Sequence, residues 1–361
     1  CNGLLRLIKT PDAVFADSKL YLDIYILGLP FVFLYNVATG IFSALGDSKT
    51  PFLFLACSSL SNIGVDILFV TAFDMGVAGV AWATFLCQGI SCVLALVVVF
   101  HRFRKIQTEG KMQIFSWQQF GRFAVVAVPS ILQQSFISVG NIVIQSVING
   151  FGPAVMAGYS ASVKLNNMVI TSLTTLGNGI SNFTAQNLGA SKFDRIRKGS
   201  LQAALIMAIL CELSMAIGLL MTIDNAYFHI FLSADKITPE TIRYGNTFLY
   251  VDYATYLMLG GIFLMRNCDQ GIGRASYALI AGAAELVARI VVSTYLPAAI
   301  VGGAVSASAS PLAFYGLCAA DPAAWLVADI ALSIPFVKNI LRQDYSYLYG
   351  EHHRHRASKA S

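Results

Sequence analysis

Charged side chains are scarce in this chain. Aspartate, glutamate, lysine and arginine make up 12% of its 361 residues, whereas hydrophobic residues make up 56%. An ordinary soluble domain carries about a quarter charged residues, because its surface faces water. So few charges could not cover the surface of a soluble protein of this length. The composition therefore argues against a soluble enzyme and indicates an integral membrane protein whose solvent is the lipid bilayer.

Histidine and cysteine are few, and the one close group of histidines, His352, His353 and His355, lies in the basic C-terminal tail, where a solvated tail is the favoured interpretation. The five histidines lie in loops, at helix ends or in the basic tail, and the seven cysteines are scattered without a CxxC pair. This distribution disfavours zinc or disulfide chemistry, and no nucleotide-binding or catalytic-triad pattern is present. The net charge of +5 comes from particular loops. It therefore indicates membrane topology, and we expect no nucleic-acid partner and no bound cofactor.

Long apolar stretches recur, each near the ~20 residues that a helix needs to cross a ~30 Å hydrocarbon core. Turn residues separate them; residues 46–51 (GDSKTP), for example, predict a threonine N-cap followed by proline at the first helical position. The chain begins with Cys1, and Gly3–Ile8 resembles the last turns of a helix, so we expect an N-terminally truncated fragment. The pattern predicts an all-α membrane protein with nine spans, at residues 18–42, 51–73, 76–100, 121–149, 154–186, 199–222, 243–265, 275–300 and 312–341.

Lysine and arginine gather in every second loop. On one side they lie at Lys49, at 102–122, at 192–198, at Arg266 and Arg274, and in the C-terminal tail. The loops on the other side hold only Arg6, Lys9, Lys19, Lys236 and Arg243. Because cytoplasmic loops carry the excess of basic residues, we expect a multi-pass protein of the plasma membrane with a cytoplasmic C-terminus.

The two halves of the chain resemble each other. Tyr21 corresponds to Tyr244, residues 40–42 (GIF) repeat at 261–263, and the Asn62/Asp66 pair corresponds to Glu285/Arg289 at nearly the same offset. Internal repeats are typical of secondary transporters, whose binding sites lie near the middle of the membrane. We predict a partial N-terminal lobe at 1–100, a cytoplasmic linker at 101–120, a C-terminal lobe at 121–342 and a cytoplasmic tail at 343–361.

Several charged residues fall inside the predicted spans, although a charge at mid-bilayer costs at least about 2.5–3.5 kcal/mol. Asn62 and Asp66 lie one turn apart, so their oxygens suit Na⁺ or, with a buried carboxyl group, a proton; a purely structural pair is an equally good interpretation. Glu285 and Arg289 have the same spacing, and an intrahelical ion pair is the simplest account of them. The remaining members of this group are Lys164, Glu212, Asp252 and Asp329.

Two lines of uncharged polar residues run along neighbouring predicted spans. Their spacing of three or four residues places each line on one helix face. Such lines can provide hydrogen bonds between helices, but two of this length favour the lining of a water-filled cavity. The lines are Gln134, Ser138, Asn141 and Gln145 in the first span, and Asn167, Thr171, Thr174, Asn178 and Asn182 in the second.

Short motifs in both halves of the chain carry a resemblance to one known family. In the first half, they are residues 44–51 (ALGDSKTP), 62–66 (NIGVD) and 76–84 (GVAGVAWAT). In the second half, they are 129–133 (PSILQ), 186–190 (QNLGA) followed by Asp194 and Arg195, and 270–273 (QGIG). With these motifs the chain resembles the multidrug and toxic compound extrusion (MATE) family, and the resemblance covers residues 3–342.

The resemblance implies a two-lobed bundle of pseudo-symmetric six-helix repeats, of which the first two to three helices would be missing. It also implies a cation site in the N-terminal lobe, made here by Asp66, Asn62, Thr84 and Asn36, with a further aspartate in the missing part. Some members carry a glutamate where this chain has residues 135–138, and Asp252 falls near another acidic position of the family.

Together, these observations predict a transporter rather than an enzyme. We expect export of small organic, often cationic compounds by a monomer, driven by Na⁺ or H⁺ through alternating access. The alternatives are a lipid-linked oligosaccharide flippase of the same superfamily and, from another class, an intramembrane lipid-modifying enzyme. The residues predicted to line the substrate cavity are Gln134, Ser138, Asn141, Gln145, Tyr159, Asn167, Thr171, Asn178 and Asp252.

Overall fold

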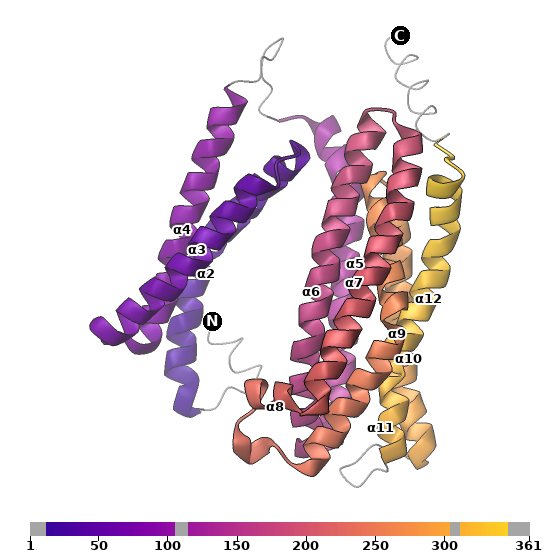
Figure 1. The fold of residues 1–361 in the computed structure, drawn as a ribbon. Coiled ribbons are helices and arrows are strands. Elements are labelled where there is room, and N and C mark those ends of the chain that lie inside the picture. The colour runs from indigo at the N-terminus through magenta and orange to yellow at the C-terminus, as the bar shows by residue number, and fades with distance from the viewer. Residues whose placement is uncertain (1–11, 105–114, 304–310, 346–361) are drawn as a thin grey trace. The chain divides into compact units, whose positions relative to one another are not determined.

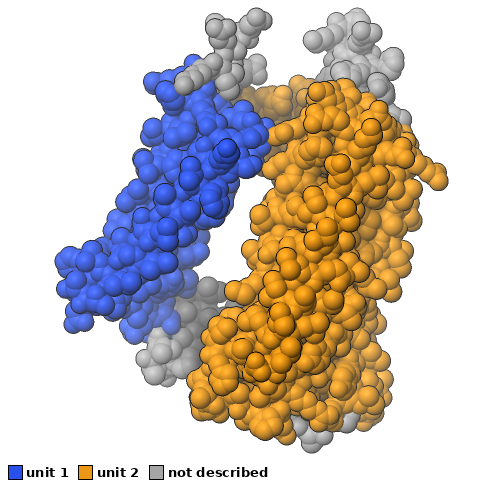
Figure 2. Space-filling view, in the orientation of Figure 1, with its two compact units in different colours: residues 1–114 blue, residues 115–361 orange. Residues whose placement is uncertain are grey.

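The computed structural model describes residues 12–104, 115–303 and 311–345. Every regular element in these ranges is a helix (Figure 1), which confirms the predicted fold class for this part of the chain. The structure divides into two compact units, residues 1–114 and residues 115–361 (Figure 2). The predicted helix end at Gly3–Ile8, and all but the first three residues of the predicted tail, lie outside the described residues.

In its described residues, 12–104, unit 1 consists of three long helices. The last of them packs against the other two, and Ala38 and Phe42 form a small core with Ala95 and Val99. The helices are α2 (Asp12–Ala44), α3 (Lys49–Ile67, continued by the π-helical turn η1, Leu68–Ala72) and α4 (Gly76–Phe103).

The turn between α2 and α3 is organised by Asp47 rather than by the predicted threonine cap. Helix α3 begins at Lys49, and the Asp47 carboxylate accepts hydrogen bonds from the backbone N–H groups of Lys49 (3.0 Å) and Thr50 (3.1 Å) and from the Thr50 hydroxyl (2.6 Å). Arg102, at the end of α4, forms an ion pair with the same carboxylate at 2.5 Å. These bonds satisfy free N–H groups at the start of α3 and connect the turn to α4.

Unit 2 is a helical bundle in which α6 (Pro153–Gly189) packs closely against α9 (Pro239–Gly271). Gly158 and Gly245 lie at a close approach of these two helices, because a Cβ at Gly245 would come 3.0 Å from the Gly158 carbonyl oxygen. Ser162 donates a hydrogen bond across the same contact to the Gly245 carbonyl at 2.9 Å. The elements are α5 (Trp117–Gly150), α6 (Pro153–Gly189), α7 (Phe193–Ile223), α8 (Ala226–Phe231), η2 (Ala234–Lys236), α9 (Pro239–Gly271), α10 (Ala275–Val301), α11 (Pro311–Cys318), α12 (Ala320–Pro335) and η3 (Phe336–Leu341).

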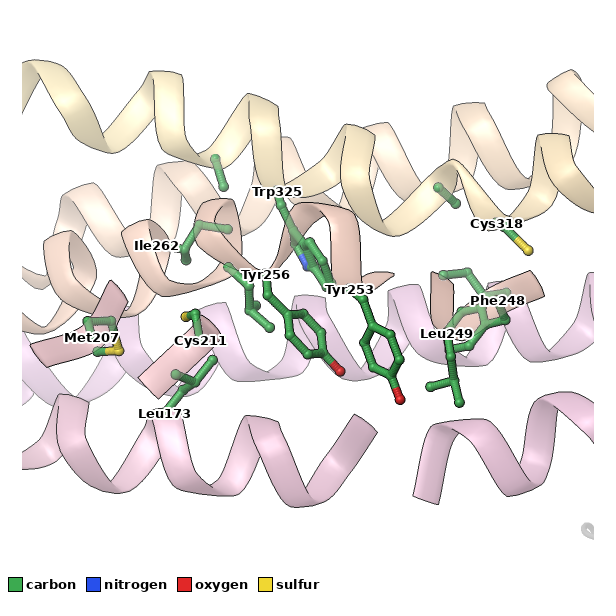
Figure 3. Packing of buried hydrophobic residues seen from close by; sticks show 14 of the residues in the cluster. Leu173, Met207, Cys211, Phe248, Leu249, Tyr253, Tyr256, Ile262, Cys318 and Trp325 are labelled. Carbon is green, nitrogen blue, oxygen red and sulfur yellow. The ribbon is translucent and has the colours of Figure 1, made fainter. Parts of the chain in front are cut away.

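The hydrophobic core of unit 2 runs along α9 (Figure 3). Tyr253 and Tyr256 stand edge to face with ring centroids 5.3 Å apart, and Trp325 of α12 is buried in the same cluster. The outward faces are also apolar: Leu60 in unit 1 and Ile334 in unit 2 are each 71% exposed. Large apolar side chains on both the inside and the outside are expected of helices surrounded by lipid.

All nine predicted spans fall on helices, but not all of these helices pass a test of length and composition for crossing a membrane. Seven pass in the described residues, and α9 makes an eighth if its two parts, which meet at a 52° bend, form one span. Helix α6 is long enough at 37 residues, but the polar residues predicted to line a cavity make it less apolar.

Several predicted spans were too short. Helix α9 continues to Gly271, six residues beyond the predicted end, and α7 begins at Phe193 rather than at residue 199. The assignment of Arg266 to a cytoplasmic loop is therefore wrong. It lies inside α9 and is buried.

Candidate functional site

The residues predicted to bind the coupling cation lie in unit 1. Asn62 and Asp66 are one turn apart on α3, and Asn62 Nδ2 lies 3.5 Å from Asp66 Oδ1. Asn62 and Thr84 line a cavity of about 230 Å³, whereas Asp66 is half-buried beside it and Asn36 on α2 is exposed. The structure thus brings Asn62 close to Asp66 and Thr84 but places Asn36 outside the cavity lining.

The lining of this cavity includes polar groups that the sequence analysis did not single out. Ser58 and Ser59 precede Asn62 by four and three residues, so they share its helix face, the same spacing that revealed the polar lines in unit 2. One carboxylate among neutral oxygens suits a monovalent cation or a proton. The other polar residues of the lining are Tyr35, Gln88 and Ser91.

A second cavity, of about 360 Å³, lies inside unit 2. Helices α5, α6, α9, α10 and α12 surround it, with Asp321 at the start of α12. Uncharged amides and aromatic rings make up much of its lining, together with two arginines and two acids. Five of the predicted cavity residues line it: Gln134, Asn141, Gln145, Tyr159 and Asn167.

Four other predicted cavity residues do not line this cavity. Ser138 and Thr171 are exposed, and their hydroxyls donate hydrogen bonds to carbonyl oxygens of their own helices, at 3.1 and 2.8 Å. Short hydroxyl side chains often bond to the preceding turn in this way, which leaves little of the side chain to reach a neighbour. Asn178 is exposed further along α6, and Asp252 is fully buried behind the cavity lining.

The charged groups of this cavity are paired with each other. Arg266 donates a hydrogen bond to Glu285 at 2.7 Å, and Arg289 forms an ion pair with Asp321 at 3.1 Å. Arg289 also lies 3.9 Å from Glu285 and donates a hydrogen bond to Asn141 at 2.7 Å. The predicted Glu285–Arg289 ion pair therefore exists, but it is the longest of these contacts.

Asp252 lies at the bend of α9. Asn166 Nδ2 donates to Asp252 Oδ2 at 2.7 Å, and Tyr256 donates to Asn166 Oδ1 at 2.9 Å. The other carboxylate oxygen, Oδ1, has no hydrogen-bond partner. The bend falls between Tyr253 and Tyr256, immediately after this residue. A buried carboxylate with one unbonded oxygen is costly, so it marks this position as a functional candidate.

In the unit 2 cavity, the sequence analysis missed three polar or charged contributors: Asn166, Arg266 and Asp321. Asn166 precedes a predicted cavity residue directly, but it falls on the neighbouring face of α6. Asp321 lies within the predicted span 312–341, so it could have been counted among the intramembrane charges. Arg266 was missed because hydropathy falls near residue 265, where the prediction ended the helix.

The other charged residues of the predicted spans do not line either cavity, although Asp329 lies close enough to Arg266 and Glu285 of the unit 2 lining to interact with them electrostatically. Lys164 and Glu212 are exposed on α6 and α7, and the Lys164 amine lies 5.8 Å from the ring of Phe231. Asp329 on α12 faces Gly261 of α9, because a Cβ at that glycine would come 2.9 Å from Asp329 Oδ1. In the described residues, no group of three or more His, Cys, Asp or Glu has the arrangement of a metal site.

Comparisons with known proteins give a consistent family assignment. The MatE family profile matches residues 1–68 and 129–295. The chain is 32% identical over 193 residues to the probable multidrug resistance protein YpnP of Bacillus subtilis (strain 168), covering 54% of this chain and 43% of YpnP. It is 28% identical over 267 residues to the probable multidrug resistance protein YoeA of the same organism, covering 71% and 56%. The chain thus spans about half the length of these curated relatives.

The fold matches solved structures as well. A crystal structure of a mutant of the MATE transporter VcmN from Vibrio cholerae superposes with a TM-score of 0.81 at 19% identity. The match covers 96% of this chain and 75% of that protein. At this identity the likeness concerns the fold.

Proposed function

The chain belongs to the MatE family, whose members are transporters rather than enzymes, and on that premise we propose that the protein exports small organic compounds, often cationic, by antiport against Na⁺ or H⁺. The observation that carries this proposal is the polar cavity in unit 2. It holds about 360 Å³, within the usual range for small-molecule sites, inside a bundle with apolar outer faces.

The lining of the cavity suits ligands of mixed polarity. The amides of Gln134, Asn141, Gln145 and Asn167 can each donate and accept hydrogen bonds, and Trp325 adds an aromatic surface. Amides adapt to different partners, which favours a broad range of organic substrates over one tightly specified molecule.

We assign the coupling cation to the site in unit 1. Asp66 carries the charge that binds Na⁺ or a proton, and Asn62 and Thr84 supply neutral oxygens. Asn36 belongs to this assignment by the family pattern, although it is exposed on α2. The protein would act as a monomer in the plasma membrane, with its C-terminus in the cytoplasm.

Two other functions are less well supported. A flippase for lipid-linked oligosaccharides would need a strongly cationic cavity for phosphate groups, but here Glu285 and Asp321 balance the two arginines and Lys164 lies outside the lining. An intramembrane lipid-modifying enzyme would need clustered histidines or aspartates at a membrane face, and the family assignment points instead to a carrier.

A vesicle assay tests the proposal. The protein is reconstituted in lipid vesicles, and movement of a fluorescent organic cation is followed with and without a Na⁺ or pH gradient. We expect gradient-driven movement that is lost in Asp66→Asn, because the amide cannot carry the charge that binds the ion. The matched control is Asp74→Asn, in the exposed turn before α4, where the left-handed backbone (φ 52°) accepts asparagine. Full transport by Asp66→Asn would refute the role of Asp66.

A further inference from the structure

We propose that Arg289 is a built-in counter-cation of unit 2. Its guanidinium group occupies, beside Asp321 and Glu285, the place that a metal cation would take at such carboxylates, so unit 2 binds no coupling cation of its own. The inference deepens the proposed function and rests on it, because it assigns cation coupling to unit 1 alone.

The geometry around Arg289 is that of a bound cation. Its two terminal nitrogens lie near oxygens on three helices: Nη2 is 3.1 Å from Asp321 and 3.9 Å from Glu285, and Nη1 donates a hydrogen bond to Asn141 at 2.7 Å. The side chain is only 7% exposed, yet it lines the cavity. Asp252 and Tyr159 also lie close enough to interact with it electrostatically. A buried guanidinium surrounded in this way supplies a permanent positive charge beside these carboxylates, because arginine does not lose its proton in proteins.

The surrounding chain leaves space for this side chain. Gly140 on α5 lies against the aliphatic part of Arg289, and a Cβ there would come 2.9 Å from Arg289 Cδ. Any larger residue at this position would therefore have to displace the arginine. Arg266 has a parallel arrangement with Glu285 at 2.7 Å, so both acids of the cavity lining are matched by arginines.

Asp252 does not form a metal site either. A hard cation such as Na⁺ needs several oxygens that converge on it. Asn166 instead turns its NH₂ group toward the carboxylate, because its oxygen accepts the hydrogen bond from Tyr256. Asn166 is thus a donor to the Asp252 carboxylate, whose other oxygen has no hydrogen-bond partner, and the charged groups near it are Asp321 and Arg289.

The internal repeat shows how the two halves differ. Asn62 and Asp66 on α3 correspond in sequence to Glu285 and Arg289 on α10. Helix α3 packs against α4, and helix α10 packs against α5 and α12. At these positions unit 1 has an amide and a carboxylate, which can bind a cation. Unit 2 has a carboxylate, Glu285, and the positively charged side chain of Arg289.

Counting bound sodium ions tests the inference. Equilibrium dialysis with radioactive Na⁺ at mildly alkaline pH, where fewer carboxyl groups are protonated, gives the number of ions bound per chain. We expect Arg289→Gln to bind one Na⁺ more than the wild type, because Asp321 and Glu285 then lack a positive partner. The gain should disappear in Arg289→Gln combined with Asp321→Asn. Arg289→Lys keeps the charge, and Arg197→Gln removes an exposed arginine of α7; neither should gain an ion.

An unchanged number of Na⁺ ions in Arg289→Gln would overturn the inference. If that variant does not fold, Asp252→Asn and Asp321→Asn in the otherwise wild-type protein decide the matter. Unchanged Na⁺ binding in both supports a built-in cation, whereas loss of one ion in either shows that unit 2 binds a metal cation and refutes it. These results are independent of the vesicle assay, in which absence of gradient-driven movement by the wild type would contradict the proposed function itself.

Discussion

Replacing only one partner of the buried ion pair between Arg266 and Glu285 should lower the stability of the protein. Its two side chains are 8% and 5% exposed and 2.7 Å apart. Removing one partner of a buried pair leaves an uncompensated charge, at a cost of about 3–5 kcal/mol. For a domain of about 150–250 residues, a change of 1 kcal/mol in the free energy of unfolding shifts the Tm by about 2–4 °C. We therefore expect Glu285→Met and Arg266→Met each to lower the apparent Tm by about 6–20 °C.

The double variant separates the ion pair from simple packing. Arg266→Met together with Glu285→Met removes both charges, keeps side chains of similar length and leaves Arg289 paired with Asp321 at 3.1 Å. Exchanges of a whole buried pair for apolar residues are often neutral or stabilising. We expect the double variant to lie close to the wild type. The assay is thermal unfolding in detergent, followed by tryptophan fluorescence or by the loss of the monodisperse peak in size-exclusion chromatography.

An exposed ion pair provides the control. Lys19 and Asp23 on α2 are 3.2 Å apart, with side chains 43% and 45% exposed. A pair in contact with solvent contributes only about 0–1 kcal/mol, so Lys19→Met should change the apparent Tm by no more than about 4 °C. Additive losses in the Arg266/Glu285 double variant, or single variants as mild as Lys19→Met, would refute the reasoning.

Two further predictions concern the turn before α3 and the packing around Arg289. The hydrogen bonds from the Thr50 hydroxyl and backbone N–H, with the nearby arginine adding to them, lower the pKa of Asp47 to about 2. The stability contributed by the Asp47 carboxylate is therefore present above its ordinary pKa of 3.8 and is lost as the pH falls toward about 2. The difference in Tm between the wild type and Asp47→Asn should shrink over that pH range. A constant difference would contradict this account. Gly140→Ala should lower the free energy of unfolding by about 1–3 kcal/mol, because its Cβ would clash with Arg289. The control is Gly121→Ala on the same helix, where a Cβ meets no atom within 4 Å. Equal melting temperatures for the two variants would rule out the contact.

The positions of the helices could be predicted from the sequence because apolar runs and basic loops are local signals. Their ends could not. Helix α9 continues through Arg266 to Gly271 because the arginine finds Glu285 on another helix. Hydropathy treats such a residue as a boundary, since it cannot see a partner that is distant in the sequence. The cap of α3 was likewise assigned to the wrong residue, because the side chain that accepts its N–H groups is Asp47.

The residues of the candidate site could also be predicted from the sequence only in part. Helical spacing was enough to find Gln134, Asn141 and Gln145, whose long amides reach the cavity in unit 2. It also selected Ser138, whose hydroxyl instead returns to its own backbone. Periodicity identifies a helix face but not the reach of each side chain. Pairing across helices, such as that of Arg289 with Asp321, requires the tertiary structure.

The two proposals together make the halves of this chain unequal in their use of cations. Asp66 in unit 1 has Asn62 Nδ2 at 3.5 Å and no ion pair among the described residues, so its charge is available to an ion that comes and goes. The guanidinium group of Arg289 is part of the chain, so its positive charge stays in unit 2. An exchangeable cation can transmit an ion gradient, because its occupancy follows the concentration on each side, whereas a tethered cation has constant occupancy. Under the two proposals, each chain therefore couples one cation, although the sequence repeat alone would suggest two.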